Sequence, residues 1–388
     1  MQPRAIRAIG YGQLVNWGVL YFSFGVLLVP LEESLDAPRW LIAGAFSLGL
    51  LVSAIVAPTV GRLADRGQGP AIMQAGGLFA AAVLIAWPFA ASIVSTYIAW
   101  ALLGLCMAAI LYEPVFAIVG RVFSDADERM RAIATVTVMG GLASTVFLPG
   151  ASAITDRFGW RVTAIALGAL VGVTTLIVGR IAFRDLEWSA STIREAITDH
   201  SSAAATTMSF DGLSRFALVF AISSIVNSAV ASNMIAALID RGFTATTAAT
   251  VAGSFGIMQL PGRLLMTNRA FTPSPVRLIV FSFGLQIAGL VALMFQGGIA
   301  VTAGVMIFAA GAGLTTLARP YWVLHRYGPE RAGEANGVIA RAQQIARAGG
   351  PVTAAALADS AGYSVVFAAL AVLLLIATAL SRTRRNVA

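Results

Sequence analysis

Runs of about twenty consecutive apolar residues recur along this chain and constrain its fold more than any other feature, because about twenty helical residues cross the roughly 30 Å core of a bilayer. Only 11% of the residues are charged, whereas soluble domains carry about 25%, so the chain cannot cover a water-facing surface. We therefore predict an all-α integral membrane protein with twelve transmembrane helices at residues 8–30, 40–62, 70–91, 96–119, 132–155, 161–182, 213–238, 244–266, 275–296, 299–325, 333–358 and 361–381.

The positions of the basic residues predict an orientation. All 26 are arginine, and most lie in short connections between apolar runs rather than in one basic patch, which argues against nucleic acid as a partner. Arginine concentrates on the cytoplasmic side of membrane proteins, and the outer connections would hold only Arg39, Arg157, Arg161 and Arg241. We predict that both termini lie inside and that the first span is retained, in a multi-pass protein of a bacterial inner membrane.

The chain divides into two halves that resemble each other. A polar stretch at 183–212 separates residues 1–182 from residues 213–388, and we expect it to be a cytoplasmic linker between two six-helix bundles. A duplicated six-helix unit is the architecture of many transporters. The motifs that recur at nearly constant separation are Gly61-Arg62-Leu63 with Gly262-Arg263-Leu264; Pro149, Asp156 and Gly159 with Pro351, Asp359 and Gly362; and Glu113-Pro114 with Arg319-Pro320.

The loop between the second and third spans has the sequence GRLADRGQG, from Gly61 to Gly69. It resembles the G-x-x-x-D-R-x-G-R signature of the major facilitator superfamily of secondary transporters, although Gly69-Pro70 replaces the closing basic residues. The sequence FGWR at 158–161 also recurs in that family. The resemblance covers nearly the whole chain, and it implies two bundles around a central cavity lined by spans one, four, seven and ten.

The same resemblance implies a gate on the inner side. Asp65 and Arg66 occupy the charged positions of the loop signature. A carboxylate is stabilised near the positive N-terminal end of a helix, and in the family that helix is span eleven. We therefore expect Asp65 and Arg66 to gate the inner side, with a simple surface turn as the alternative.

Two further features resemble the monocarboxylate and oxalate–formate branch of the family. NWGVLYFSFGV in the first span is similar to the aromatic and glycine-rich first helix of that branch. In the eighth span, monocarboxylate carriers have an Asp four residues before a substrate-binding Arg, where this chain has Gln259 and Arg263. Many proton-coupled exporters carry an Arg in span four where this chain has Trp100. The resemblance thus implies that Arg263 binds an anion, and it disfavours a drug–proton exporter.

Charged side chains inside the spans are the first candidates for transport, because each costs at least about 2.5–3.5 kcal/mol at the bilayer centre unless it has a partner or a watery cavity. Glu113 is the one acid deep within a predicted span, and Arg319 is placed similarly in span ten. Each precedes a proline, which permits a kink. We predict that Glu113 and Arg319 face each other across the inner half of the cavity and that Glu113 carries protons. A static ion pair between the bundles is the alternative.

An arginine fork matches a carboxylate with two parallel hydrogen bonds. The arginines that we predict to bind an anion are Arg263, Arg319, Arg341 and Arg347. For Arg263 and Arg341 the alternative is that they are only charges at the inner membrane face. The long Arg341 side chain would then extend to the inner interface. Because Arg341 and Arg347 are not on one helical face, they cannot both point squarely into one cavity.

Polar and aromatic side chains also gather on one face of the first span, at Gln13, Asn16, Trp17 and Tyr21. Tyr112 lies beside Glu113, and Asn227 has a similar setting in span seven. We predict that these residues contact a small solute, and polar contacts between helices are the alternative.

Nothing in the sequence predicts covalent chemistry. The chain has one cysteine, Cys106, and two histidines, His200 and His325, with no metal-binding spacing. We expect no enzyme activity, no cofactor and no metal, in a protein that works as a monomer surrounded by lipid. The predicted function is alternating-access transport of a small monocarboxylate-type anion in symport with protons. The alternatives are an efflux carrier for drugs, arsenicals or other toxic compounds, and a membrane sensor that transports nothing.

Overall fold

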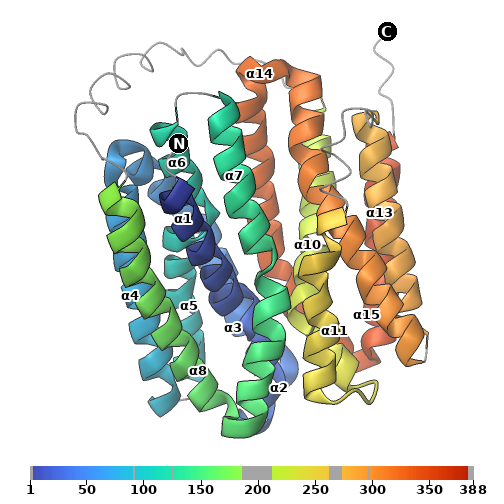
Figure 1. The fold of residues 1–388 in the computed structure, drawn as a ribbon. Coiled ribbons are helices and arrows are strands. Elements are labelled where there is room, and N and C mark those ends of the chain that lie inside the picture. Colours follow the sequence, from blue (N-terminus) through green and yellow to red (C-terminus); the bar gives the residue numbers. More distant parts are fainter. Residues whose placement is uncertain are drawn as a thin grey trace.

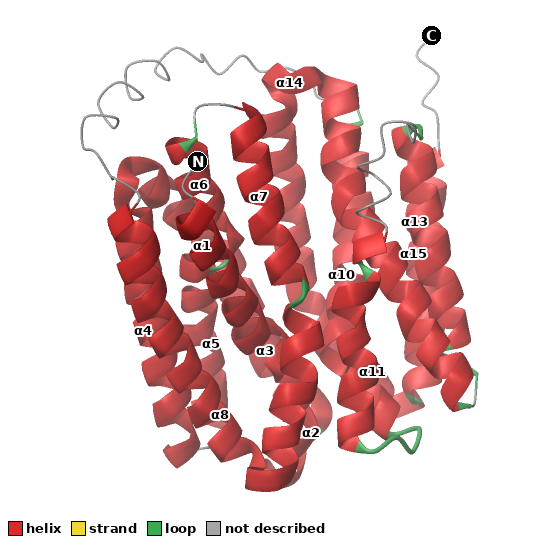
Figure 2. Ribbon diagram, viewed as in Figure 1, coloured by secondary structure: helices red, strands yellow, loops and turns green. Residues whose placement is uncertain are grey.

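The computed structural model describes residues 3–90, 92–123, 126–185, 212–261, 273–295 and 297–382. Within these ranges the chain forms helices and short connections and no strand (Figure 2). The all-α fold class is therefore confirmed. The elements are α1 (Pro3–Trp17), η1 (Gly18–Phe22), α2 (Ser23–Leu35), α3 (Arg39–Leu63), η2 (Ala64–Gln68), α4 (Gly69–Ala86), η3 (Trp87–Ala90), α5 (Ile93–Ile110), α6 (Tyr112–Val122), α7 (Ala126–Gly141), α8 (Ala143–Asp185), α10 (Leu213–Ile239), α11 (Ala245–Met258), α13 (Pro275–Ala292), α14 (Gly298–Ala361) and α15 (Tyr363–Arg382).

Several predicted spans share one continuous helical element. Among the described residues, nine helical segments are long and apolar enough to cross a membrane. The segment Arg131–Ala182 contains the fifth and sixth predicted spans, and α14 contains the tenth and eleventh. Part of the eighth predicted span lies outside the described residues, and α11 is correspondingly short. The protein is thus a multi-pass helical membrane protein, while the count of twelve and the orientation stay predictions.

Two glycine turns repeat the same backbone conformation in the two halves of the chain. Gly159 within α8 has φ 81° and ψ 163°, and Gly362 after α14 has φ 78° and ψ 162°. This region of positive φ is open essentially to glycine alone. The two turns follow Asp156 and Asp359, the positions that the internal repeat equates, and their matching geometry supports a duplication.

The helices of the two halves gather on opposite sides of the molecule. Figure 1 shows α1–α8, coloured blue to green, beside α10–α15, coloured yellow to red. The helix pairs with the largest contacts between the halves are α3 with α14, α8 with α11, and α2 with α10. We name the two ends of the bundle outer and inner by the predicted orientation. The described part of the 183–212 linker is the end of α8 and Gly212.

Small residues bring α8 and α11 into direct backbone contact. Thr145 donates its hydroxyl hydrogen to the Gly253 carbonyl over 2.8 Å and accepts from the Ile257 amide over 3.1 Å. A Cβ added to Gly256 would lie only 2.5 Å from Thr145 Oγ1 and 2.7 Å from the Gly141 carbonyl oxygen. Small residues permit close approach where lipid supplies no hydrophobic driving force between helices, so this contact is a tight joint between the two halves.

A second junction between the halves lies at the outer end and is centred on Arg39. Its Nε donates to Glu32 Oε2 over 2.7 Å, and its Nη1 donates to Asp240 Oδ2 over 3.0 Å and to the Tyr363 hydroxyl over 3.4 Å. Arg39 and Glu32 belong to the first half, whereas Asp240 and Tyr363 belong to the second. We call these four residues the Arg39 latch. The Arg39 side chain is only 13% exposed, so solvent weakens the latch less than it weakens a surface ion pair.

We predict that Arg39→Gln opens the outer end. A hydrogen bond to a charged group contributes about 1.5–3 kcal/mol, and the bond to Asp240 is the charged contact of Arg39 that crosses the halves. Its loss is therefore expected to raise the population of outward-open molecules about tenfold or more. The measurement is the labelling rate, with a membrane-impermeant maleimide, of a cysteine placed at Ser232, which is 2% exposed between the halves. The background is Cys106→Ser, which removes the chain's one natural thiol.

The matched control for this experiment is Arg157→Gln, an identical change at the outer end. The Arg157 guanidinium lies over the ring of its neighbour Phe158, and no ion pair is found for it among the described residues. Labelling at Ser232→Cys should stay within twofold in that control. Equal labelling in both arginine variants would show that the latch does not hold the outer end closed.

Candidate functional site

The fourth predicted span is broken at Leu111, between α5 and α6. Leu111 has φ −80° and ψ −153°, an extended conformation between two helices. Pro114 has no N–H and so cannot bond to the carbonyl of Ile110, four residues before it. Gln13 Nε2 donates to that carbonyl oxygen over 2.7 Å, and Asn16 Nδ2 donates over 3.2 Å. The first span therefore supplies the hydrogen bonds that the proline removes.

These bonds fix the positions of Gln13 and Asn16, two residues that we predicted to contact a solute. Gln13 is fully buried and Asn16 is 6% exposed. The amide groups hold the break, while Gln13 Oε1 and Asn16 Oδ1 are buried and find no hydrogen-bond partner among the described residues. Both side chains thus have a role in contacts between helices.

A proline in α14 is compensated in the same manner. Pro351 leaves the carbonyl of Arg347 without its helical donor, and Ser228 Oγ of α10 donates to that oxygen over 2.8 Å. This contact fixes the backbone of Arg347 against the first helix of the second half. The Arg347 backbone is therefore held in place at the turn that precedes Pro351.

The intramembrane charges meet between the halves through two glutamines. Gln344 Nε2 donates to Glu113 Oε1 over 2.6 Å, and Arg319 Nη1 donates to Gln343 Oε1 over 2.5 Å. No ion pair joins Glu113 directly to Arg319 in the described ranges. Glu113 still interacts electrostatically with Arg319 and Arg347. We call Glu113, Arg319, Gln343, Gln344 and Arg347 the charge cluster.

Arg347 is the cation of the cluster whose fork is available to an anion. Its guanidinium carbon lies 5.9 Å from the centroid of the Tyr21 ring, a cation–π distance. It forms no ion pair with any carboxylate that the structure describes. Arg319, by contrast, already donates to Gln343. The cluster thus holds two guanidinium groups beside the single carboxylate of Glu113: that of Arg319 is hydrogen-bonded, and that of Arg347 is available to an anion.

Aromatic rings form a wall next to Arg347 and Glu113. The Trp17 ring lies 5.3 Å from Tyr21 and 4.9 Å from Tyr112, and Tyr112 stacks on Phe116 at 5.2 Å, all between centroids. Three of these residues were predicted to contact solute, and the structure brings them together from η1 and the helices α1 and α6. Phe116 was not predicted, although it follows Tyr112 by one helical turn.

Other predicted residues lie apart from the cluster. Asn227 Nδ2 donates to Gln286 Oε1 over 3.1 Å and to the Ser223 carbonyl over 2.8 Å, so it belongs to a polar network inside the second half. Arg341 is exposed. Trp100 is 1% exposed and meets Phe24 edge to face, so it fills a packed core.

Two candidate site residues of the sequence analysis, Arg263 and Asp65, lie wholly or partly outside the structural description. Arg263 lies outside the described residues, and so does the side chain of Asp65. The loop that holds Asp65 is the short helix η2, in which Gly67 has φ 88°. Arg66 is exposed there. The inner gate and the anion ligand in span eight therefore stay predictions.

Gln343 and Gln344 are the site residues that the sequence analysis missed. The signal was present, because two adjacent amides lie between Arg341 and Arg347 inside an apolar span. An amide inside a span is a weaker signal than a charge. Yet a neutral amide has a donor for a carboxylate and an acceptor for a guanidinium, whereas an ionised carboxylate or guanidinium has only one of the two. In the structure, Gln344 bonds to Glu113 and Gln343 bonds to Arg319.

Charged groups held between two similar halves of a bundle of apolar helices are the arrangement found in many secondary transporters. The family model of the Major Facilitator Superfamily matches residues 11–351. The chain belongs to this superfamily.

Relatives and solved structures agree with that assignment. The chain is 26% identical over 166 residues to monocarboxylate transporter 11 of Homo sapiens, and 30% identical over 155 residues to monocarboxylate transporter 13 of Bos taurus. These matches cover 43% and 40% of this chain, and 33% and 35% of the relatives, so the chain matches about a third of each relative's length. Its fold resembles that of the human organic anion transporter MFSD10, with a TM-score of 0.69, 15% identity and coverage of 98% and 99% of the two chains. It also resembles the nucleoside transporter NupG, with a TM-score of 0.74, 11% identity and the same coverage.

Proposed function

We propose that this protein is a secondary active transporter that moves a small monocarboxylate-type anion by alternating access, in symport with protons. The observation that carries the proposal is the charge cluster, in which Gln344 of one half bonds to Glu113 of the other, beside the available fork of Arg347. The setting we propose is a bacterial inner membrane, with the protein working as a monomer.

The charges of the cluster favour a singly charged anion. Glu113 offsets one of the two guanidinium groups, so one positive charge is left for a ligand when all three groups are ionised. An intramembrane charge is costly unless it is paired, and one carboxylate at Arg347 would complete the pairing. The names of the relatives, monocarboxylate and organic anion transporters, support the same substrate class.

Glu113 supplies a route for coupling to protons. A hydrogen bond to an ionised carboxylate contributes about 1.5–3 kcal/mol, whereas a bond between neutral groups contributes about 0.5–1.5 kcal/mol. Protonation of Glu113 therefore weakens its bond to Gln344, which ties α6 to α14 across the two halves. A proton on Glu113 also frees Arg319 and Arg347 to hold the anion more strongly. Proton and anion thus favour each other's binding, as symport requires.

The test is accumulation of labelled formate, lactate and pyruvate in proteoliposomes that carry an inside-alkaline pH gradient. We expect accumulation above protein-free liposomes, which control for passive entry of the neutral acids, and collapse on addition of a protonophore. The aromatic wall of Trp17, Tyr21 and Tyr112 also suits amphiphilic compounds, so efflux of toxic compounds is the second candidate function. No anion accumulation, together with drug or arsenical resistance in expressing cells, would favour efflux. No flux of any solute would favour a sensor.

A further inference from the structure

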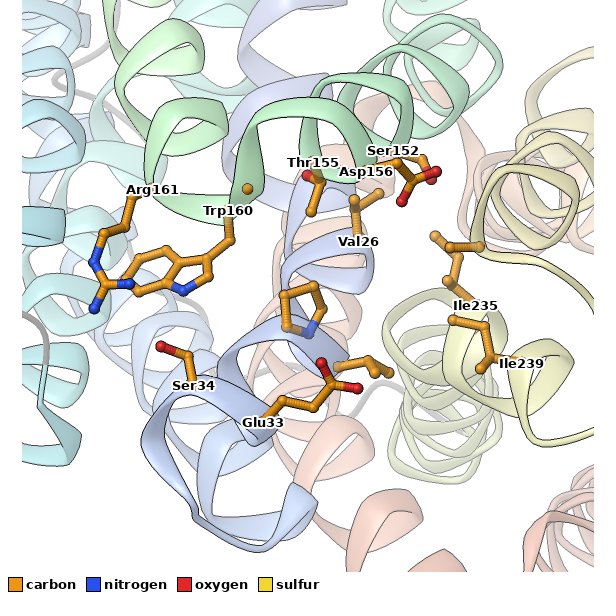
Figure 3. Close-up of a pocket in the computed structure, with 14 residues that line it drawn as sticks. Val26, Glu33, Ser34, Ser152, Thr155, Asp156, Trp160, Arg161, Ile235 and Ile239 are labelled. Atoms are coloured by element: carbon orange, nitrogen blue, oxygen red, sulfur yellow. The ribbon is translucent and has the colours of Figure 1, made fainter.

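A cavity of about 570 Å³ opens at the outer end, separate from the charge cluster. Its walls come from α2 and α8 of the first half, and from α10 and the start of α11 in the second half (Figure 3). None of its lining residues belongs to the charge cluster or to the aromatic wall. Pockets that hold drug-sized ligands measure about 300–1,000 Å³, so this cavity is large enough for one small organic molecule.

The cavity joins an apolar wall to an acidic rim. Val26, Ile235 and Ile239 line it with aliphatic side chains, and the carboxylates of Glu33 and Asp156 lie at its edge (Figure 3). Asp156 accepts a hydrogen bond from Thr246 over 2.6 Å, so its carboxylate is held in place. Amphipathic ligands need this combination of an apolar body site and a charged edge.

The one lining arginine does not neutralise this rim. The Arg161 guanidinium lies over the Trp160 ring, 4.6 Å from the nearer centroid, and Nε donates to the carbonyl of Pro88 over 3.3 Å. Figure 3 places it on the far side of the Trp160 ring from Glu33 and Asp156. The charges that face the cavity are therefore the two carboxylates, and they attract a cation.

An indole N–H in the cavity wall lacks an acceptor in the part of the chain that the structure describes. It is Nε1 of Trp160, a side chain that is 5% exposed. An unmet buried donor costs about 1–3 kcal/mol, and a ligand that brings an acceptor oxygen recovers that energy when a small rotation of the ring turns its N–H toward the cavity. The wall thus selects for an oxygen atom in addition to a cation.

We propose that this cavity binds an amphipathic organic cation that carries a hydrogen-bond acceptor, and that the bound cation inhibits transport. The apolar part of the ligand packs on Val26 and Ile235, its ammonium group pairs with Glu33 or Asp156, and its oxygen accepts from Trp160. Because both halves form the walls, the ligand stabilises their present arrangement, and a ligand shifts an equilibrium toward the state that it binds better. Binding stands without the proposed function, whereas inhibition rests on it.

The experiment compares two aromatic esters, tetracaine and butamben, on the purified full-length chain. Both have a butyl group, an aromatic ring and an ester oxygen, but only tetracaine carries a tertiary amine that is cationic at neutral pH. We expect saturable binding of tritiated tetracaine in a scintillation proximity assay, and no displacement by an equal concentration of butamben. Displacement by butamben at equal concentration would overturn the role of the carboxylates.

Variants locate the site. In Glu33→Gln with Asp156→Asn, the affinity for tetracaine should fall about tenfold, equivalent to about 1.4 kcal/mol, and Trp160→Phe should reduce it about threefold. Glu113→Gln should leave the affinity within twofold, because Glu113 lies outside the cavity. Unchanged affinity in the double variant, or loss of binding in Glu113→Gln, would overturn the proposal. Where the double variant does not fold, Glu33→Gln alone provides the measurement, since Glu33 is exposed.

Discussion

Replacing Glu113 by Gln is expected to abolish accumulation driven by the pH gradient while exchange of labelled for unlabelled anion continues. Gln is nearly the same size as Glu and still offers an oxygen to Gln344, so the contact between α6 and α14 is preserved. The amide does not take up a proton, so no group remains through which the proton gradient drives transport. We expect gradient-driven accumulation to fall about tenfold or more, because one tenfold step corresponds to only about 1.4 kcal/mol of lost coupling.

The measurement is initial uptake into proteoliposomes over a series of outside pH values at constant inside pH, paired with a counterflow assay. Asp36→Asn is the control, since it makes the same change of carboxylate to amide at an exposed outer turn. Asp36 has positive φ (47°), which Asn tolerates. Retained accumulation with the normal pH dependence in Glu113→Gln would exclude Glu113 as the proton carrier, whereas loss of counterflow as well would indicate damage to the anion site.

Replacing Arg347 by Gln is expected to remove anion binding. Its guanidinium is the available fork of the charge cluster, and two charge-assisted hydrogen bonds to a carboxylate contribute about 3 kcal/mol together. Affinity should therefore fall about 100-fold. Arg347→Lys keeps the positive charge but loses the planar fork, so it should recover only part of that loss.

The KM for counterflow separates these variants from each other. We expect the KM to be lowest in the unmodified protein, higher in Arg347→Lys and highest in Arg347→Gln, with Arg180→Gln at the exposed end of α8 as the control for loss of one arginine. If Arg347→Gln kept a normal KM, the anion would have to bind elsewhere, and Arg319 would be the next residue to replace. A fall in maximal rate at constant KM would assign Arg347 to the conformational change instead.

The sequence predicted the fold class, which the structure confirms, because apolar runs are visible without coordinates. It also selected Glu113 and Arg319 as candidates, because charges inside apolar runs are equally visible. It did not predict that Gln343 and Gln344 would separate this pair. That arrangement depends on the rotation of α14, and an amide inside a span has many potential partners. Gln13 and Asn16 were correctly singled out as polar residues on one face, but periodicity alone cannot show that this face meets the carbonyl freed by Pro114.

Arg39 illustrates a different limit. In the sequence it was counted only as an outer charge, since its partners Asp240 and Tyr363 are distant in the chain. Opposite charges in separate connections can pair in many ways, and only the approach of α3 to the end of α10 selects this one. Junctions between the halves therefore require coordinates, whereas the composition of each half does not.

The compensation of Pro114 and Pro351 has a consequence for how the chain is built into the membrane. A carbonyl left without a donor in lipid costs several kcal/mol, so each of the two prolines requires a neighbouring helix, here called the helper, whose side chain donates to the freed carbonyl. In both cases the helper is synthesised earlier: Gln13 and Asn16 precede Pro114, and Ser228 precedes Pro351. When the ribosome delivers either proline, the side chains that satisfy the exposed carbonyl have already left the tunnel. The order of the helices along the chain is thus also a workable order of assembly during translation.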